Sequence, residues 1–154
     1  MLDLNCKSVF LLSTLYARDH ADDPDATLIN VSSVGGYAVF PGSTFYCATK
    51  YFVSAFSEGL AQELAAKGHP MRVRILAPAA TETEFEQAAH NSDEKVDYTK
   101  KFSSFTTADR MAEYVMELYD GDKTVFTMDF SQFRYVFSDP RHPNTYKSAT
   151  DQIK

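Results

Sequence analysis

Three residues, Ser33, Tyr46 and Lys50, have side chains and positions suited to moving a proton. Tyr46 and Lys50 have the i, i+4 spacing that places two side chains on one face of a helix. A free tyrosine ionises near pH 10, so acid–base work near pH 7 requires a pKa about three units lower, or roughly 4 kcal/mol. A neighbouring ammonium and the positive end of a helix both lower the pKa of a phenol. Ser33, at the end of the preceding predicted strand, can donate a second hydrogen bond to the same substrate oxygen.

The chain contains a second Tyr-x-x-x-Lys pair, Tyr119 and Lys123, with a hydroxyl residue, Thr106, at the matching distance upstream. Spacing alone therefore does not choose between the two pairs. Gly121 lies inside the second pair and is expected to end the helix there, so its side chains would not share a face. Helix continuity favours the first pair.

The elements that would position these side chains alternate between helix and strand. Apolar residues at helical spacing predict helices over residues 2–18 and 44–67, and a third that begins with the capping-box pair Thr106 and Asp109. Short apolar runs predict buried strands over residues 28–31, 71–76 and 124–128. This alternation is typical of an α/β protein with a parallel sheet, and it accounts for about half of a doubly wound sheet.

Four segments around these residues carry a resemblance. They are LDLNCKSVFLL with Asn5, LINVSSVGGY with Ser33, FYCATKYFVSAFSEGLAQEL with Tyr46 and Lys50, and RVRILAPAATETEF. In their order and content they resemble the short-chain dehydrogenase/reductase family over roughly residues 1–86. The resemblance implies that Tyr46 is the catalytic acid/base and that Lys50 lowers its pKa and binds the nicotinamide ribose. It also implies that Ser33 orients the substrate oxygen and that Asn5 holds a relay water near Lys50.

The resemblance further implies a nicotinamide cofactor, NAD or NADP. Pro78, Ala79 and Thr83 match the family's segment that contacts the nicotinamide and its phosphates, with Ala79 in place of a glycine, and they join Tyr46 and Lys50 in the expected cofactor site. A Rossmann-type reductase also needs a glycine-rich turn for the pyrophosphate, and the six glycines of the chain form no such array. We therefore expect a partial Rossmann-like domain, a doubly wound parallel sheet lacking its N-terminal half, that alone does not bind NAD(P) with ordinary affinity.

The expected organisation is a catalytic half over residues 1–129 and an aromatic-rich tail, without an assigned element order, over residues 130–154. Near-alternation of aromatic residues from Phe133 to Phe137 fits an extra edge strand. The predicted helix 44–67 is apolar on two sides, more than one sheet can cover. In the family this helix and the Asn-bearing helix commonly build the subunit interface, so the resemblance implies a homo-oligomer through helices 2–18 and 44–67.

Composition argues against several other classes of protein. A net charge of −6 and a pI near 5.1 argue against a nucleic-acid or anionic-membrane partner. No apolar run has the length that a transmembrane helix requires. Cys6 and Cys47 have no metal-ligand spacing and could form only one bridge, so a reducing, cytoplasmic location is expected.

Two functions from different classes follow from these observations. The first is a NAD(P)-dependent oxidoreductase acting on a small-molecule carbonyl/alcohol pair, in which Tyr46 handles the proton. The second is a non-enzymatic remnant of such an enzyme that serves as an interaction or oligomerisation module. In a domain without its N-terminal half, the strand around Leu28 would lack a neighbour and expose an apolar edge.

Overall fold

The structure is a computed structural model that describes residues 1–90 and 96–142. Its centre is a four-stranded sheet in the order β1-β2-β5-β6. The strands are β1 (Thr27–Val31), β2 (Arg72–Ala77), β5 (Val125–Asp129) and β6 (Arg134–Ser138). The first three are parallel, and β6 runs antiparallel to β5 at the edge. The predicted α/β fold with a parallel sheet is therefore confirmed.

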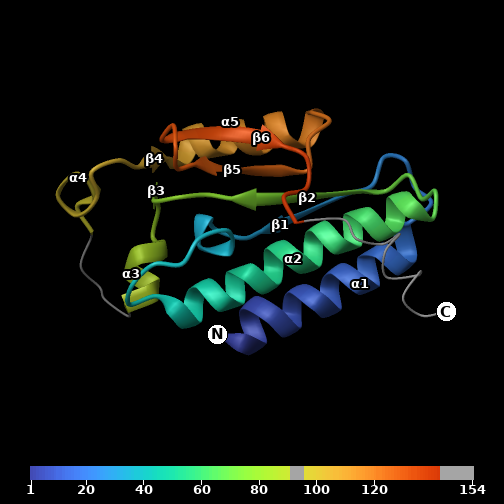
Figure 1. Ribbon diagram of the computed structural model, residues 1–154, viewed down its shortest axis with the longest axis horizontal. Helices are drawn as coiled ribbons and strands as arrows, with labels where there is room; N and C mark the ends of the chain where they lie inside the picture. The colour runs from blue at the N-terminus through green and yellow to red at the C-terminus, as the bar shows by residue number, and fades with distance from the viewer. Residues whose placement is uncertain (91–95, 143–154) are drawn as a thin grey trace.

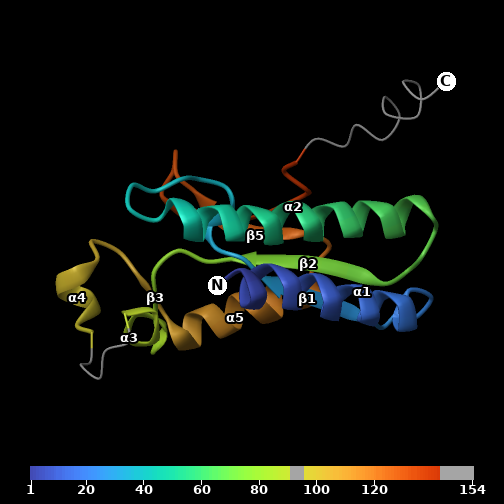
Figure 2. The same ribbon diagram turned by 90° about the horizontal axis from the view of Figure 1, so that it is seen from below.

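Helices cover both faces of the sheet (Figures 1 and 2). α1 (Ser8–His20) and α2 (Thr44–Ala66) lie on one face, and α5 (Ala108–Asp120) lies on the other. Ala17, Leu64 and Val73 join α1 and α2 to the sheet in one buried cluster. Leu118 and Phe126 belong to the cluster on the α5 side. The three predicted helices and three predicted strands are all present, with small shifts at their ends.

The N-terminus of α5 differs from the predicted capping box. Thr107, not Thr106, caps the helix, and its hydroxyl accepts a hydrogen bond from the Arg110 amide at 3.3 Å. The Thr106 hydroxyl instead donates to the Tyr135 hydroxyl at 3.2 Å. The prediction was wrong by one residue because a partner distant in sequence takes this hydroxyl.

The C-terminus of α5 lies where it was predicted. The helix ends before Gly121, so Tyr119 and Lys123 do not share a helical face. Arg74 on β2 donates hydrogen bonds to the carbonyl oxygens of Gly121, Asp122 and Lys123 at 2.7, 3.0 and 2.6 Å. This buried guanidinium satisfies carbonyl groups at and beyond the helix end and fixes that end against the sheet.

Four short elements fill the polar stretch between β2 and α5. They are β3 (Thr81–Glu82), α3 (Phe85–His90), α4 (Tyr98–Lys101) and β4 (Thr106–Thr107). β3 and β4 pair in parallel, which closes this stretch on itself beside the carboxyl end of β2 (Figure 1). Residues 91–95 lie outside the described part of the chain.

The beginning of the aromatic-rich tail belongs to the same sheet. β6 pairs with β5 along its whole length, which confirms the edge strand expected from the near-alternation. Its Tyr135 and Phe137 pack against the buried Phe126, with ring centroids 4.7 and 5.1 Å apart. Residues 143–154 of the tail lie outside the described residues.

A buried carboxylate fixes the chain beyond β6. Glu58 on α2 is 1% exposed, and one of its oxygens accepts hydrogen bonds from the backbone amides of Arg141 and His142 at 2.6 and 2.7 Å. The Tyr37 hydroxyl donates to the other oxygen at 2.6 Å. These hydrogen bonds offset the cost of burying the charge. The C-terminal segment is therefore tied both to α2 and to the loop that carries Tyr37.

β1 forms a free edge of the sheet in the described part of the chain. Its last residue, Val31, is 56% exposed. This agrees with the apolar edge expected of a strand that lacks a neighbour. Among the described residues, no helix has both the length and the apolar character needed to span a bilayer.

Candidate active site

Ser33 lies just past the carboxyl end of β1, where the chain leaves the sheet. The next residue, Val34, donates its amide to the Pro78 carbonyl at 2.9 Å and so holds the loop against the end of β2. The Ser33 hydroxyl accepts a hydrogen bond from the Gly35 amide at 3.1 Å and caps the short 3-10 turn that follows. The same hydroxyl donates a long hydrogen bond to the Pro78 carbonyl at 3.5 Å, a proton that it can redirect to a substrate oxygen.

Tyr46 and Lys50 occupy the first turns of α2 on one face, as their spacing predicts. The Lys50 ammonium lies 5.7 Å from the centre of the Tyr46 ring. The same ammonium donates to the Val31 carbonyl at 3.1 Å, at the end of β1. Lys50 therefore joins the start of α2 to the strand that leads into Ser33.

Ser33 and Tyr46 meet across the glycine pair that follows Ser33. A Cβ atom on Gly35 would lie 3.5 Å from the Ser33 hydroxyl oxygen and 3.5 Å from Cε1 of Tyr46. A Cβ atom on Gly36 would lie only 2.7 Å from the Lys50 carbonyl oxygen. The two glycines therefore let the loop approach α2 closely enough to bring the three side chains together. The sequence analysis did not single them out, although the Gly-Gly pair two residues after the candidate catalytic Ser33 was visible.

Burial raises the pKa of Tyr46, which is opposite to the shift that acid–base catalysis near pH 7 requires. The hydrogen bond with Ser33 acts in the lowering direction, and the charge of Glu86 raises the pKa further. Burial also lowers the pKa of Lys50, because the ammonium loses hydrating water. The expected lowering of the Tyr46 pKa is thus absent from the described polypeptide, where the Lys50 ammonium is hydrogen-bonded to the Val31 carbonyl.

Asn5 lies in a π-helical turn, Asp3–Lys7, that opens the first helix. Its side-chain nitrogen donates to the Thr49 hydroxyl at 3.0 Å, and that hydroxyl donates to the Tyr46 carbonyl at 2.8 Å. Turns of this kind are frequent at functional sites. The structure therefore links Asn5 to α2 through Thr49, a residue that the sequence analysis missed. The relay water near Lys50 stays a prediction.

The expected cofactor-contacting residues after β2 are only partly brought to the site. The Pro78 carbonyl adjoins the Ser33 loop through Val34. The Ala79 amide instead donates to the Tyr135 hydroxyl at 3.2 Å, and the Thr83 hydroxyl accepts from the Phe85 amide at 3.2 Å. A role for these three residues toward a cofactor stays a prediction.

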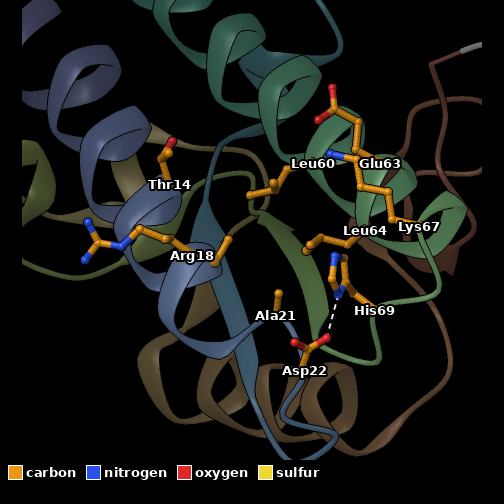
Figure 3. A pocket seen from close by; sticks show the side chains of 10 residues that line it. Thr14, Arg18, Ala21, Asp22, Leu60, Glu63, Leu64, Lys67 and His69 are labelled. Carbon is orange, nitrogen blue, oxygen red and sulfur yellow. Dashed lines mark hydrogen bonds and ion pairs between the residues drawn. The ribbon is translucent and has the colours of Figure 1, made fainter.

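A cavity of about 370 Å³ lies at the other end of α1 and α2 (Figure 3). Its lining comes from the last turns of both helices and the loops after them: Thr14, Ala17, Arg18, Ala21, Asp22, Leu60, Glu63, Leu64, Lys67 and His69. The His69 ring nitrogen and an Asp22 carboxylate oxygen lie 2.7 Å apart at its rim. No member of the Ser33–Tyr46–Lys50 set lines it, so it is separate from the candidate active site.

Comparison with known proteins identifies the family. The model of the short chain dehydrogenase family matches residues 1–94, a stretch that contains Asn5, Ser33, Tyr46 and Lys50. The chain belongs to the short-chain dehydrogenase family. An uncharacterized oxidoreductase of Staphylococcus saprophyticus is 36% identical over 115 residues, which cover 75% of this short-chain dehydrogenase and 47% of that protein. The human dehydrogenase/reductase SDR family member 11 is 41% identical over 71 residues, 45% of this chain and 27% of that protein. The chain therefore spans less than half the length of these relatives.

Solved structures of other dehydrogenases share this fold over the part that aligns. The closed form of a serine dehydrogenase complexed with NADP+ has a TM-score of 0.73 at 21% identity, covering 93% of this chain and 59% of that one. A Sphingobium yanoikuyae short-chain dehydrogenase in complex with NADPH has a TM-score of 0.63 at 24% identity, covering 99% of this chain and 52% of that one. At such identities the likeness concerns the fold, and it confirms the partial Rossmann-like α/β class.

Proposed function

We propose that this chain carries the proton-transfer half of a NAD(P)-dependent oxidoreductase acting on a carbonyl/alcohol pair. The observation that supports it best is the meeting of Ser33 and Tyr46, which come from different elements, across the Gly35 backbone. Two hydroxyl groups there can address one substrate oxygen. We place this protein in the cytoplasm and expect it to form homo-oligomers through α1 and α2.

The residues present fit the nicotinamide end of such a cofactor. Lys50 supplies a cationic donor, Tyr46 supplies a hydroxyl group and Pro78 offers an apolar ring, whereas the Thr83 hydroxyl would have to leave the Phe85 amide and the Thr81 carbonyl to reach a cofactor. A bound nicotinamide would supply or accept the hydride. The glycine-rich cradle for the pyrophosphate is not found in this sequence, and we propose that it lies outside the 154 residues.

In the reducing direction, Tyr46 donates its phenolic proton to the carbonyl oxygen as that oxygen gains negative charge. Ser33 donates a hydrogen bond to the same oxygen and keeps it in line with the phenol. Lys50 stabilises the phenolate left on Tyr46 by its positive charge, and Asn5 supports the helix backbone beneath them through Thr49. In the oxidising direction the same phenolate takes the proton from the alcohol.

The test substitutes Tyr46 by Phe in a chimera in which the N-terminal half of the Staphylococcus saprophyticus relative precedes Met1. Loss of the acid/base group should lower kcat/KM for carbonyl reduction by at least about 100-fold. Tyr119→Phe is the matched control, because it removes a hydroxyl from the other Tyr-x-x-x-Lys pair, and it should leave kcat/KM unchanged. Equal activity of Tyr46→Phe and its parent would remove Tyr46 from the mechanism.

The exposed apolar side chains of the first helices favour the second candidate function, an interaction module. Leu4 is 73% exposed, Leu12 is 68% exposed and Phe10 is 46% exposed. Apolar surface of this extent along one pair of helices is typical of an interface. A chimera that self-associates but reduces no carbonyl would favour this alternative over the oxidoreductase.

A further inference from the structure

An aromatic ring stands directly beside the candidate acid/base. Phe85, the first residue of α3, has its ring centroid 6.3 Å from that of Tyr46, with the planes inclined at 51°. The Phe85 side chain is nevertheless 54% exposed. A large apolar side chain left open at a reaction site offers contact area to whatever binds there.

The backbone that carries Phe85 is fixed from two directions. The Thr83 hydroxyl accepts the Phe85 amide at 3.2 Å, and the Tyr98 hydroxyl donates to the Thr83 carbonyl at 3.1 Å. Thr81, just upstream, pairs with Thr106 across β3 and β4. The ring therefore projects from a braced turn, so its position beside Tyr46 is preorganised.

Further apolar side chains surround this end of α2. In the loop between Ser33 and Tyr46, Val39 is largely exposed, and Phe45 at the start of α2 is too. Phe40 in the same loop makes an edge contact with Phe130 at 6.1 Å between centroids. This loop and α3 both lie at the end of the molecule where α2 begins (Figures 1 and 2).

The charged residues next to Phe85 in the sequence are acidic. Glu82 and Glu84 are exposed beside it in the sequence, and Glu86 is paired with Lys101. Acidic groups at the rim disfavour anionic ligands by like-charge repulsion. The Phe85 side of the site therefore combines open aromatic surface with acidic neighbours, whereas the Lys50 ammonium on α2 is hydrogen-bonded to the Val31 carbonyl.

We propose that the substrate is an uncharged ketone, aldehyde or alcohol whose reacting carbon bears an aromatic group, and that this group packs on Phe85. Phe85 is then the specificity-determining residue of the site. A ring held on Phe85 places the attached carbon and its oxygen next to the Tyr46 hydroxyl. This proposal rests on the proposed oxidoreductase function, since it assigns a substrate class to the same site.

Binding of three probe ketones to the 154-residue chain tests the proposal without a cofactor. Acetophenone carries the aromatic ring, pinacolone has an aliphatic group of similar bulk, and benzoylformate adds a negative charge. By ligand-observed NMR titration, acetophenone should bind more tightly than the other two. Phe85→Ala should lower the affinity for acetophenone about tenfold or more. Phe85→Tyr keeps the aromatic ring and should bind acetophenone like the parent.

Phe133→Ala serves as the matched control. Phe133 is also an exposed ring, at 80%, and the turn between β5 and β6 that carries it lies away from α3 in both views (Figures 1 and 2). This variant should bind acetophenone like the parent. Equal binding of acetophenone and pinacolone, or an unchanged affinity in Phe85→Ala, overturns the proposal.

Measurement of turnover in the chimera distinguishes failure of this substrate class from failure of the proposed oxidoreductase function. Reduction of acetophenone and pinacolone with equal kcat/KM overturns the substrate class and leaves the oxidoreductase function standing. Binding of acetophenone that depends on Phe85, without reduction of any of the three ketones, overturns the oxidoreductase function and leaves the aromatic ligand class standing.

Discussion

Replacement of Gly36 by Ala should destabilise this protein more than any other glycine-to-alanine change in its helices or site. The added Cβ atom would lie 2.3 Å from the Ser54 hydroxyl oxygen, 2.4 Å from the Ser32 hydroxyl oxygen and 2.7 Å from the Lys50 carbonyl oxygen. The two serine hydroxyls can rotate away. The carbonyl belongs to the backbone of α2, so either the loop or the helix must move.

The size of the effect follows from these contacts. Overpacking of a close contact costs about 1–3 kcal/mol. Rotation of Ser32 also breaks its hydrogen bonds to Ser54 and to the Lys50 carbonyl, at 2.8 and 3.0 Å, each worth about 1 kcal/mol. The sum is about 3–5 kcal/mol, a large part of the roughly 5–15 kcal/mol by which domains are stable. Tm should therefore fall by roughly 6–20 °C, since each kcal/mol lowers Tm by about 2–4 °C for a chain of this size.

Urea unfolding of the purified chain, followed by far-UV circular dichroism, measures the free energy of unfolding of each variant. Gly59→Ala is the matched control, since Gly59 lies within α2 and a Cβ atom there meets nothing within 4 Å. It should stabilise the chain by about 0.5–1 kcal/mol, because alanine favours the helix. A Gly36→Ala chain as stable as the parent would refute the close approach of the loop to α2.

Two further changes test buried groups outside the site. Burial, together with the Glu58 carboxylate, raises the pKa of Tyr37. The stability that depends on the neutral phenol is therefore complete below about pH 10 and is lost as the pH rises beyond that value. Tyr37→Phe should remove one late step from an ultraviolet titration of the tyrosines, and an unaltered titration would contradict this. Arg74→Met should lower the free energy of unfolding in urea by about 2–4 kcal/mol, because three carbonyl groups lose their donor. The exposed Arg110→Met should leave the free energy of unfolding nearly unchanged. Equal losses in the two arginine variants would argue against the buried role of Arg74.

The order of elements and the central pair of the site were predictable because they depend on local patterns. Apolar periodicity marked α1, α2 and α5, and the strands between them were short apolar runs bounded by loops. Helix continuity was enough to prefer Tyr46 over Tyr119, since Gly121 ends α5 as predicted. Each of these features depends on residues within one or two helical turns.

Features that depend on distant partners could not be predicted in the same way. Thr107 caps α5 in place of the predicted Thr106, because the Thr106 hydroxyl is hydrogen-bonded to the Tyr135 hydroxyl. The pKa of Tyr46 is raised, whereas a lowered value was expected, because burial outweighs the hydrogen bond with Ser33. The spacing of residues in a sequence does not reveal burial. The contact between Phe85 and Tyr46 depends on α3 lying beside the start of α2, an arrangement that no local sequence pattern indicates.

The Glu58 contact has a consequence for how this protein tolerates evolutionary change. The carboxylate accepts hydrogen bonds from the backbone N–H groups of residues 141 and 142. Every amino acid except proline has this backbone donor. Substitutions at these two positions keep the backbone hydrogen bonds, although they change the contacts of the Arg141 and His142 side chains with the Tyr37 ring and of His142 with Glu58. This attachment depends on the acidic residue Glu58, because no neutral side chain would accept hydrogen bonds as strongly from two amides and a phenol at once. The segment after β6 can therefore change its side chains and still keep its backbone attachment to α2.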